Sequence, residues 1–286
     1  ILKYWVRSKN DDLKVIPTDS IVMKVDKEAV RRSGMMIPGD SIPDYMHISL
    51  KGKRALYKSE LMMLEMLAEA NWERPIYMAV SVGTENHLGM GNHFVQEGLT
   101  YRFTPFDTEK TGIKLDSEKM YDNLMNKFKF GGIDKEGIYI DENAMRMCYS
   151  HRRIFSQLIG QLIREGKTDK AKAALEYAEK MIPAYNVPYD WQNGAMQMAE
   201  AYYQLGEKEK GDNIMKALAD KAVEYLTWYL SLDDQRFAMS SHEVVDYQLP
   251  ILSTEVKLMQ KYNSELAPVY DSKLNELYQM CVDRMK

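Results

Sequence analysis

Two histidines and a glutamate in a glycine-rich segment are the residues of this chain that come nearest to a chemical site. His87 and His93 flank Gly89 and Gly91, and Glu97 follows His93 by about one helical turn. Converging imidazoles and a carboxylate could hold a metal, and glycine amides could bind a phosphate. The segment lacks a phosphate-loop lysine, and its histidine spacing matches none of the common zinc patterns. We therefore predict a tight loop with no catalytic residue, metal ligand or cofactor site. An enzyme whose site lies near His87, His93 and Glu97 stays open as an alternative.

A cysteine and a histidine three residues apart form a second candidate. Cys148 and His151 can share one face of a predicted helix, and Arg152 and Arg153 follow them. Neighbouring cations lower the pKa of a thiol and make it reactive. Free cysteine is nevertheless among the most buried residue types, so we expect Cys148 to face a helical core. The other cysteine, Cys281, is far away in sequence, and the pair suggests no disulfide framework.

Aromatic side chains recur on successive predicted helices of the C-terminal half. Packing between helices is their ordinary role. The alternative is a groove in which rings and carboxylates hold a peptide or a sugar. The candidate groove residues are Trp191, Tyr202, Tyr203 and Trp228.

Composition limits the class of protein. The chain has 286 residues, of which 45% are apolar and 28% charged, as is ordinary for a globular protein. The 38 basic and 42 acidic residues give a net charge of −4, and no basic stripe predicts a nucleic-acid surface. No apolar run approaches the roughly 20 residues of a transmembrane helix. Because the chain starts at Ile1 without an initiator methionine or signal peptide, we interpret it as a piece of a longer protein.

The elements that must position these side chains fall into two parts. Residues 1–135 alternate short β-prone runs with short helical stripes, which predicts a small mixed α/β domain. The apolar run Pro75–Val82 is expected to be a buried central strand. The other expected strands are Leu13–Ile16, Ser20–Val25, Tyr45–Leu50 and Leu99–Phe106. The expected helices are Lys27–Arg32 capped by Asp26, Leu56–Ala70, a short helix within Gly83–Gly98, and one that Asp116 or Ser117 caps and that runs to Phe128.

Residues 136–286 are predicted to be helical almost throughout. Eight residues have the spacing of a tetratricopeptide repeat, a helix pair with a glycine at its turn and small residues on its second helix. They are Phe155, Leu158, Leu162, Gly166, Ala171, Leu175, Ala178 and Pro183. A weaker second repeat carries Ala199, Tyr202, Gly206 and Gly211. Helices are expected at about 141–165, 168–182, 190–205, 208–231, 242–261 and 264–284, and the last ones show no turn glycine or closing proline. The predicted fold class is therefore α+β, with a tetratricopeptide-like helical array after the α/β domain.

Several segments of the chain resemble the C-terminal soluble region of a bacterial family of multi-spanning membrane proteins. That region is a domain of unknown function, and the family is similar to protein O-mannosyltransferases. The segments appear in the same order and with similar spacing over most of residues 40–230. They are Ile42–Leu50, Leu56–Lys58, Asn71–Tyr77, Gln96–Arg102, Met120–Phe128, Ile138–Asn143 and the repeat that ends at Pro183.

The resemblance implies a non-catalytic module of a membrane glycosyltransferase, on the periplasmic (extracytoplasmic) face of the membrane. In that family the catalytic acidic residue belongs to the membrane portion, so no catalytic residue is carried over to this sequence. The implied partners are an acceptor protein, a glycan or a partner subunit, and the membrane-embedded N-terminal domain of the same protein. A free-standing repeat scaffold for protein–protein interaction is the alternative outside glycosylation.

The matched segments also contain polar residues that could lie between the two halves. We predict a polar inter-domain surface formed by Arg102, Tyr121, Asp122 and Lys127. Trp72 is expected to pack over the joint between a helix and the strand that follows it.

Overall fold

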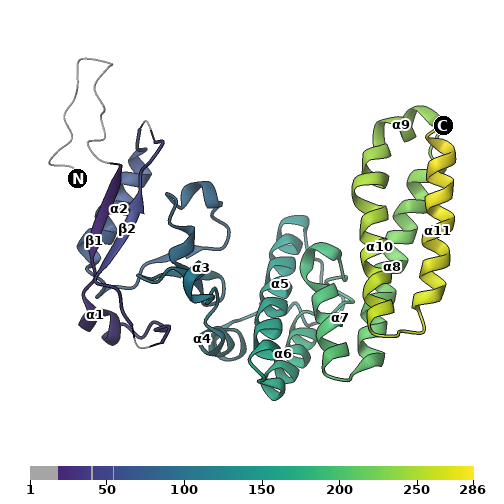
Figure 1. Cartoon of the computed structure of the whole chain (residues 1–286). Coiled ribbons are helices and arrows are strands. Elements are labelled where there is room, and N and C mark those ends of the chain that lie inside the picture. Colours follow the sequence, from purple (N-terminus) through teal and green to yellow (C-terminus); the bar gives the residue numbers. More distant parts are fainter. Residues whose placement is uncertain (1–18, 40, 54) are drawn as a thin grey trace, which may run out of the picture. The chain divides into compact units, whose positions relative to one another are not determined.

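The chain forms two compact units. A computed structural model describes residues 19–39, 41–53 and 55–286, and the chain divides into residues 1–123 and 124–286 (Figure 1). The first unit contains the strands of the described residues, and the second is a helical array. The α+β class predicted from the sequence is confirmed. The boundary predicted after residue 135 lies a short distance inside the second unit, and the strand expected at Leu13–Ile16 lies outside the described residues.

The first sheet of the N-terminal unit is an antiparallel pair. Strand β1, Ser20–Lys24, pairs with β2, Tyr45–Ser49. Met46 and Ile48 are buried while their neighbours along β2 are exposed, so the alternation read from the sequence is confirmed. Helix α1, Lys27–Arg32, begins where the carboxylate of Asp26 accepts a hydrogen bond from the amide of Ala29, as predicted.

The second sheet corrects one prediction. Its strands are β3, Tyr77–Ala79; β4, Phe94–Gln96; and β5, Thr100–Phe103, in the spatial order β3-β5-β4. The predicted central strand over Pro75–Val82 is wrong, because β3 is an edge strand of three residues with exposed side chains at both ends. A turn in which the amide of Val82 donates to the carbonyl of Ala79 ends β3 early. Strand β5 takes the central place.

The glycine-rich segment after β3 is folded as turns and a strand. The short helix expected there is present as two 3₁₀ turns, Thr84–Asn86 and Gly91–His93. Strand β4 follows directly, and the sequence did not indicate it. The remaining helices of this unit are α2, Lys58–Ala70; α3, Thr108–Thr111; and α4, Ser117–Asp122, which Asp116 caps as predicted and which continues as a π-helical turn, Asn123–Lys127.

Trp72 lies at the joint between α2 and the second sheet, as expected. Its ring stacks on Phe103 with 5.4 Å between centroids, and its Nε1 donates to the carbonyl of Lys24 at 3.0 Å. Asn71 and Trp72 both have positive φ, which lets the chain reverse directly after the helix. Trp72 therefore joins the two sheets and α2 into one core.

The C-terminal unit is built mainly from helical hairpins. Helix α5 packs on α6, α7 on α8, and α8 and α11 on α10. The bounds are α5, Glu142–Arg164; α6, Thr168–Met181; α7, Ala195–Gln204; α8, Lys208–Ser231; α9, Asp234–His242; α10, Leu249–Lys261; and α11, Ala267–Arg284. A 3₁₀ turn, Trp191–Asn193, precedes α7, and a π-helical turn, Glu243–Gln248, joins α9 to α10. The apolar positions of the eight-residue frame are at most 1% exposed in α5 and α6.

Three hairpins turn in the same way. Gly166 and Gly206 have left-handed φ of 71° and 79°, and the next amide donates back to the carbonyl five residues before it. Asn263, with φ of 52°, does the same between α10 and α11, where the amide of Ser264 donates to Met259. The last hairpin therefore has a turn residue after all, and asparagine replaces the glycine that we looked for.

The close contact of α7 with α8 predicts the effect of an alanine at Gly211. A Cβ there would lie 2.7 Å from a ring carbon of Tyr203, a side chain held by its own hydrogen bond to Asp212. We expect Gly211→Ala to lower the free energy of unfolding by about 1–3 kcal/mol through overpacking. A Cβ at Gly160 of α5 would have the end of the Arg164 side chain as its nearest neighbour, at 3.7 Å. Gly160→Ala should therefore raise the free energy of unfolding by about 0.5–1 kcal/mol. Urea denaturation of both variants checks this, and equal effects would contradict it.

Candidate functional site

A buried arginine of α5 holds the segment that connects α6 to α7. Arg152 is 1% exposed, and its guanidinium donates to the carbonyls of Ile182, Val187 and Pro188 at 2.7, 2.6 and 3.0 Å. Burial lowers its pKa to about 10, so it is still charged at neutral pH. One charged group thus satisfies three backbone carbonyls of a segment that has no regular structure of its own.

Tyr189 and Asn193 complete this anchoring. The guanidinium carbon of Arg152 lies 5.0 Å from the centroid of the Tyr189 ring, and the Tyr189 hydroxyl donates to Glu179. Burial, together with the Glu179 carboxylate, raises the pKa of Tyr189. The fully buried amide of Asn193 donates to the carbonyl of Pro188 at 3.0 Å. The connecting segment therefore enters α7 in a fixed conformation.

The end of this segment and helix α8 together present a charged and aromatic surface, which we call the aromatic face: Asp190, Trp191, Lys221, Tyr225 and Trp228. Asp190 and the Lys221 ammonium are paired at 2.6 Å, and the ammonium lies 5.9 Å from the Tyr225 ring centroid. Tyr225 and Trp228 are three residues apart on α8, so they are neighbours on its surface. Trp191, Tyr225 and Trp228 are 43%, 44% and 54% exposed. Rings of this size beside an ion pair can pack on a ligand and bond to its polar groups.

A buried carboxyl group lies near the same ion pair. Glu255 of α10 is 1% exposed, and its Oε2 has no hydrogen-bond partner. Burial, and next the negative charge of Asp190, raise its pKa to about 8. A carboxyl group with a strongly raised pKa beside a charged surface is typical of functional sites.

The structure divides the four groove residues predicted from the sequence. Trp191 and Trp228 are exposed and belong to the aromatic face. Tyr202 and Tyr203 are 1% and 8% exposed, so the prediction that they line a binding groove is wrong. Their hydroxyls donate to Glu179 and Asp212, and the pKa of both is raised by burial first and the bonded carboxylate second. Both tyrosines hold the helices together.

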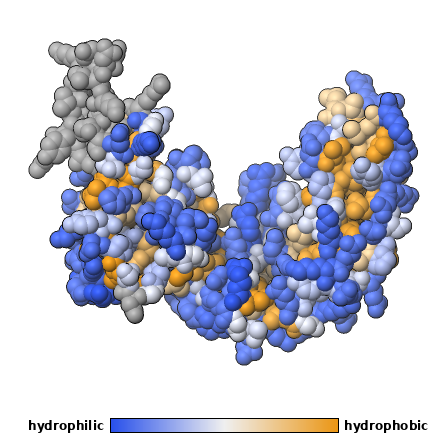
Figure 2. Space-filling view, in the orientation of Figure 1, coloured by the Kyte–Doolittle hydropathy of each residue, from blue (hydrophilic) through white to orange (hydrophobic). Residues whose placement is uncertain are grey.

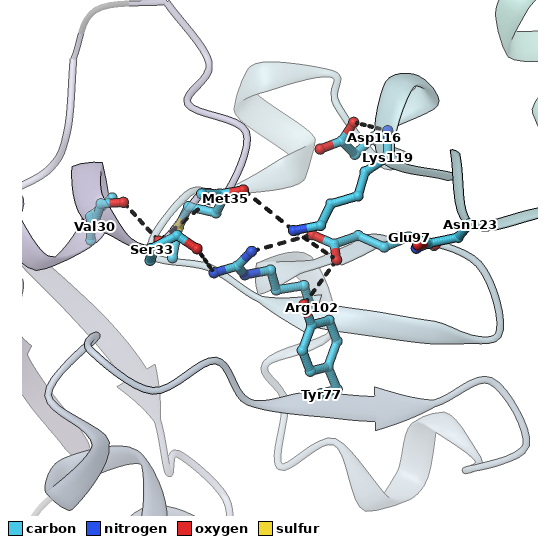
Figure 3. Close-up of polar contacts among 10 residues, drawn as sticks. Val30, Ser33, Met35, Tyr77, Glu97, Arg102, Asp116, Lys119 and Asn123 are labelled. Carbon is cyan, nitrogen blue, oxygen red and sulfur yellow. Dashed lines mark hydrogen bonds and ion pairs between the residues drawn. The ribbon is translucent and has the colours of Figure 1, made fainter. Parts of the chain in front are cut away.

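Glu97 and Arg102 form a polar cluster inside the N-terminal unit (Figure 3). They are 3% and 1% exposed, with 3.6 Å between Oε1 and Nη1. Glu97 also accepts from the hydroxyl of Tyr77 at 3.0 Å and pairs with Lys119 at 3.5 Å, while Arg102 donates to the carbonyl of Ser33 at 2.7 Å. The cluster connects β3, β5, α4 and the end of α1, so its role is structural.

These contacts correct the expected place of Arg102. We predicted it at a polar surface between the domains, but its side chain is buried within the first unit, where Glu97 balances its charge and the carbonyl of Ser33 accepts a hydrogen bond from it. Tyr121 and Asp122 are half-buried at the end of α4, and Lys127 is exposed. A polar inter-domain surface containing Tyr121, Asp122 and Lys127 stays a prediction.

The histidines of the enzyme alternative are buried separately. His87 and His93 are 6% and 8% exposed and pack against Phe94 and Phe103 respectively, and burial lowers the pKa of His93. Within the described residues, no three potential metal ligands converge. Cys148 is buried as expected, and burial raises the pKa of its thiol.

Comparison with known proteins gives one match. The model of a family described as TMEM260-associated domain 2 matches residues 2–123. The match ends where the first compact unit ends. No curated protein matches the chain, and no solved structure does. Among the helices of the described ranges, none has both the length and the apolar character needed to cross a bilayer.

The anchoring role of Arg152 can be tested with a matched pair of variants. Lysine keeps the charge but cannot donate to three carbonyls in a fixed fork. We expect Arg152→Lys to lower the free energy of unfolding by about 2–4 kcal/mol and to speed amide hydrogen exchange in residues 183–193. The exposed neighbour Arg153 is the control, and Arg153→Lys should change stability by less than about 0.5 kcal/mol. Unchanged exchange in Arg152→Lys would contradict the anchoring.

Glu255 predicts a pH dependence of stability. Its pKa rises from 4.5 in the unfolded chain to about 8 in the fold, so between these values the folded state binds the extra proton and stability falls as pH rises. Glu255→Gln should remove this loss. Its advantage over the parent should grow with pH between about 5 and 8, by up to about 1.4 kcal/mol per pH unit. Glu265 is exposed, and Glu265→Gln is the control. If the free energy of unfolding depends on pH in the same way for Glu255→Gln and for the parent, the raised pKa of Glu255 is refuted.

Proposed function

We propose that this chain is a non-catalytic binding module of a membrane glycosyltransferase of the protein O-mannosyltransferase-like type. Its aromatic face holds a polypeptide segment of the acceptor protein while the membrane portion of the enzyme carries out sugar transfer. The module lies on the periplasmic, extracytoplasmic side of the membrane. Two other ligands of the aromatic face are to be tested, namely a glycan and a partner subunit.

The observation that carries this proposal is the exposed set of rings around a fixed ion pair. Trp191, Tyr225 and Trp228 offer large apolar surfaces, and Asp190 and Lys221 offer an acceptor and donors for the amides of an extended peptide. We take the helical hairpins of this unit to be a tetratricopeptide-like array, and arrays of that type present binding surfaces made from successive repeats. Figure 2 shows other hydrophobic residues, distinct from these rings, at the surface over the region of α8 and α10.

The membrane context is supported by the N-terminal unit. Residues 2–123 match a domain named for its association with TMEM260. The resemblance of segments in both units to the soluble region of multi-spanning transferase-like proteins agrees with that association. A free-standing scaffold would need the aromatic face but not this N-terminal unit. The enzyme alternative near His87, His93 and Glu97 is weakened because Glu97 is committed to Tyr77, Arg102 and Lys119.

Peptide binding by the whole chain tests the proposed role of the aromatic face. A random peptide library displayed on phage is selected against the immobilised protein, and the selected peptides are synthesised and measured by calorimetry. Because tryptophans that become covered in an interface are typical binding hot spots, Trp191→Ala combined with Trp228→Ala should weaken binding by more than about tenfold. Tyr278→Ala removes an exposed ring of α11 and is the control, with an expected change below about twofold.

Two results would overturn the proposal. One is a selection that yields no peptide, with glycans on an array binding at the aromatic face instead. The other is a set of peptides whose affinity is the same for the parent and the double alanine variant. Circular dichroism of the variants separates loss of binding from loss of fold.

A further inference from the structure

The N-terminal unit contains a cavity that the proposed function does not use. It has a volume of about 640 Å³ and lies against the edge of the second sheet, where β3 continues into the segment with the two 3₁₀ turns. Ligand sites of small molecules occupy about 300–1,000 Å³. The cavity therefore has room for a molecule of one or two rings.

One wall of the cavity is apolar and aromatic. Val80, Phe94 and Tyr101 contribute to it, and they belong to or directly follow strands of the second sheet. Aromatic rings in a wall favour a flat, partly apolar ligand face.

A buried histidine supplies an unused hydrogen-bonding group in the same cavity. His87 is only 6% exposed and lines the cavity. Its Nε2 has no hydrogen-bond partner. A buried polar atom without a partner destabilises the fold. Because Nε2 itself has almost no accessible surface, the ring has to shift slightly toward the cavity before a ligand hydroxyl can bond to this nitrogen and relieve that cost.

The other polar groups of the lining carry no net charge. Glu109 and Lys114 both line the cavity, and they pair with each other at 2.7 Å. The Asn92 side chain bonds to Asp107, which fixes its amide at the cavity wall. An anionic ligand would have to compete with Glu109 for Lys114, so the lining favours a neutral ligand with several hydroxyls.

We propose that this cavity binds a neutral sugar ring. A pyranose has an apolar face of C–H groups, which suits the wall of Phe94 and Tyr101, and a rim of hydroxyls, which suits Nε2 of His87 and the Asn92 amide. The inference does not depend on the aromatic face of the other unit. It assigns to the N-terminal unit a ligand site of its own.

The test uses the full chain and simple sugars. Methyl glycosides of glucose, galactose and mannose are the neutral probes, and glucuronic acid and glucose 6-phosphate are the charged ones. Binding is followed by saturation-transfer difference NMR and by titration of backbone amide shifts. We expect at least one neutral glycoside to bind, with shifts at Thr84 to Gln96, and both charged probes to bind at least tenfold more weakly.

Matched variants then locate the site. Thr84 is exposed and lines the cavity, so Thr84→Trp should fill it and abolish binding. Ser81, between the lining residues Val80 and Val82, is exposed and does not line the cavity, so Ser81→Trp should leave binding unchanged. His87→Phe keeps a ring but removes the nitrogen, and should weaken binding at least tenfold. If His87→Phe does not fold, the two tryptophan variants decide the question.

Three outcomes would overturn the inference. They are no binding of any neutral glycoside, preferential binding of a charged probe, and binding that Thr84→Trp does not reduce. The double variant Trp191→Ala, Trp228→Ala should bind the sugar normally, so failure of this site and failure of the peptide-binding face are told apart.

Discussion

The candidate binding surface depends on the charge of Arg152 inside α5. A guanidinium that is 1% exposed must satisfy its donors within the protein, and it does so on three carbonyls of the segment between α6 and α7. Tyr189 and Asn193 add further hydrogen bonds to the same segment. Asp190 and Trp191 lie within this anchored stretch, so their position depends on Arg152 together with these two residues. Lysine has the same charge but not the planar arrangement of donors.

The N-terminal unit uses a buried arginine in a different way. Arg102 is paired with Glu97, and the pair is surrounded by Tyr77, Lys119 and the carbonyl of Ser33. Replacement of a buried ion pair by apolar residues is often neutral for stability, whereas removal of one partner is costly. We therefore infer that this cluster fixes the positions of β3, β5, α4 and the end of α1 relative to one another. It leaves the polar groups of the nearby cavity, such as Nε2 of His87, outside the network.

Sequence patterns were sufficient for most helices and for two of the turns. The eight-residue frame, Gly206 and Gly211 identified the first two hairpins because their spacing reports on local packing. Both helices of the third hairpin were predicted, but its turn residue was missed because Asn263 takes the left-handed position that glycine usually occupies. The central strand was assigned to the most apolar run, yet β5 is central, since pairing between strands depends on contacts that hydropathy does not encode.

The candidate site was only half visible in the sequence. The recurrence of aromatic residues on successive helices pointed to Trp191 and Trp228. The sequence does not distinguish exposed from buried aromatic residues, so the buried Tyr202 and Tyr203 were included wrongly. Tyr225 and the ion pair of Asp190 with Lys221 were not assembled, because 31 residues separate the two charges. Glu97 and Arg102 were not paired beforehand, because the sequence did not indicate β4. In the β4–β5 hairpin Arg102 lies opposite Val95, and Glu97 is its diagonal neighbour on the same face.

The size of the native protein in its host tests our proposal that this chain acts as part of a larger membrane glycosyltransferase. Membrane and soluble fractions are separated and probed with an antibody raised against the chain. We expect a membrane-bound band much heavier than the 33.2 kDa of these 286 residues. A soluble band near 33.2 kDa would contradict it and leave an independent binding protein.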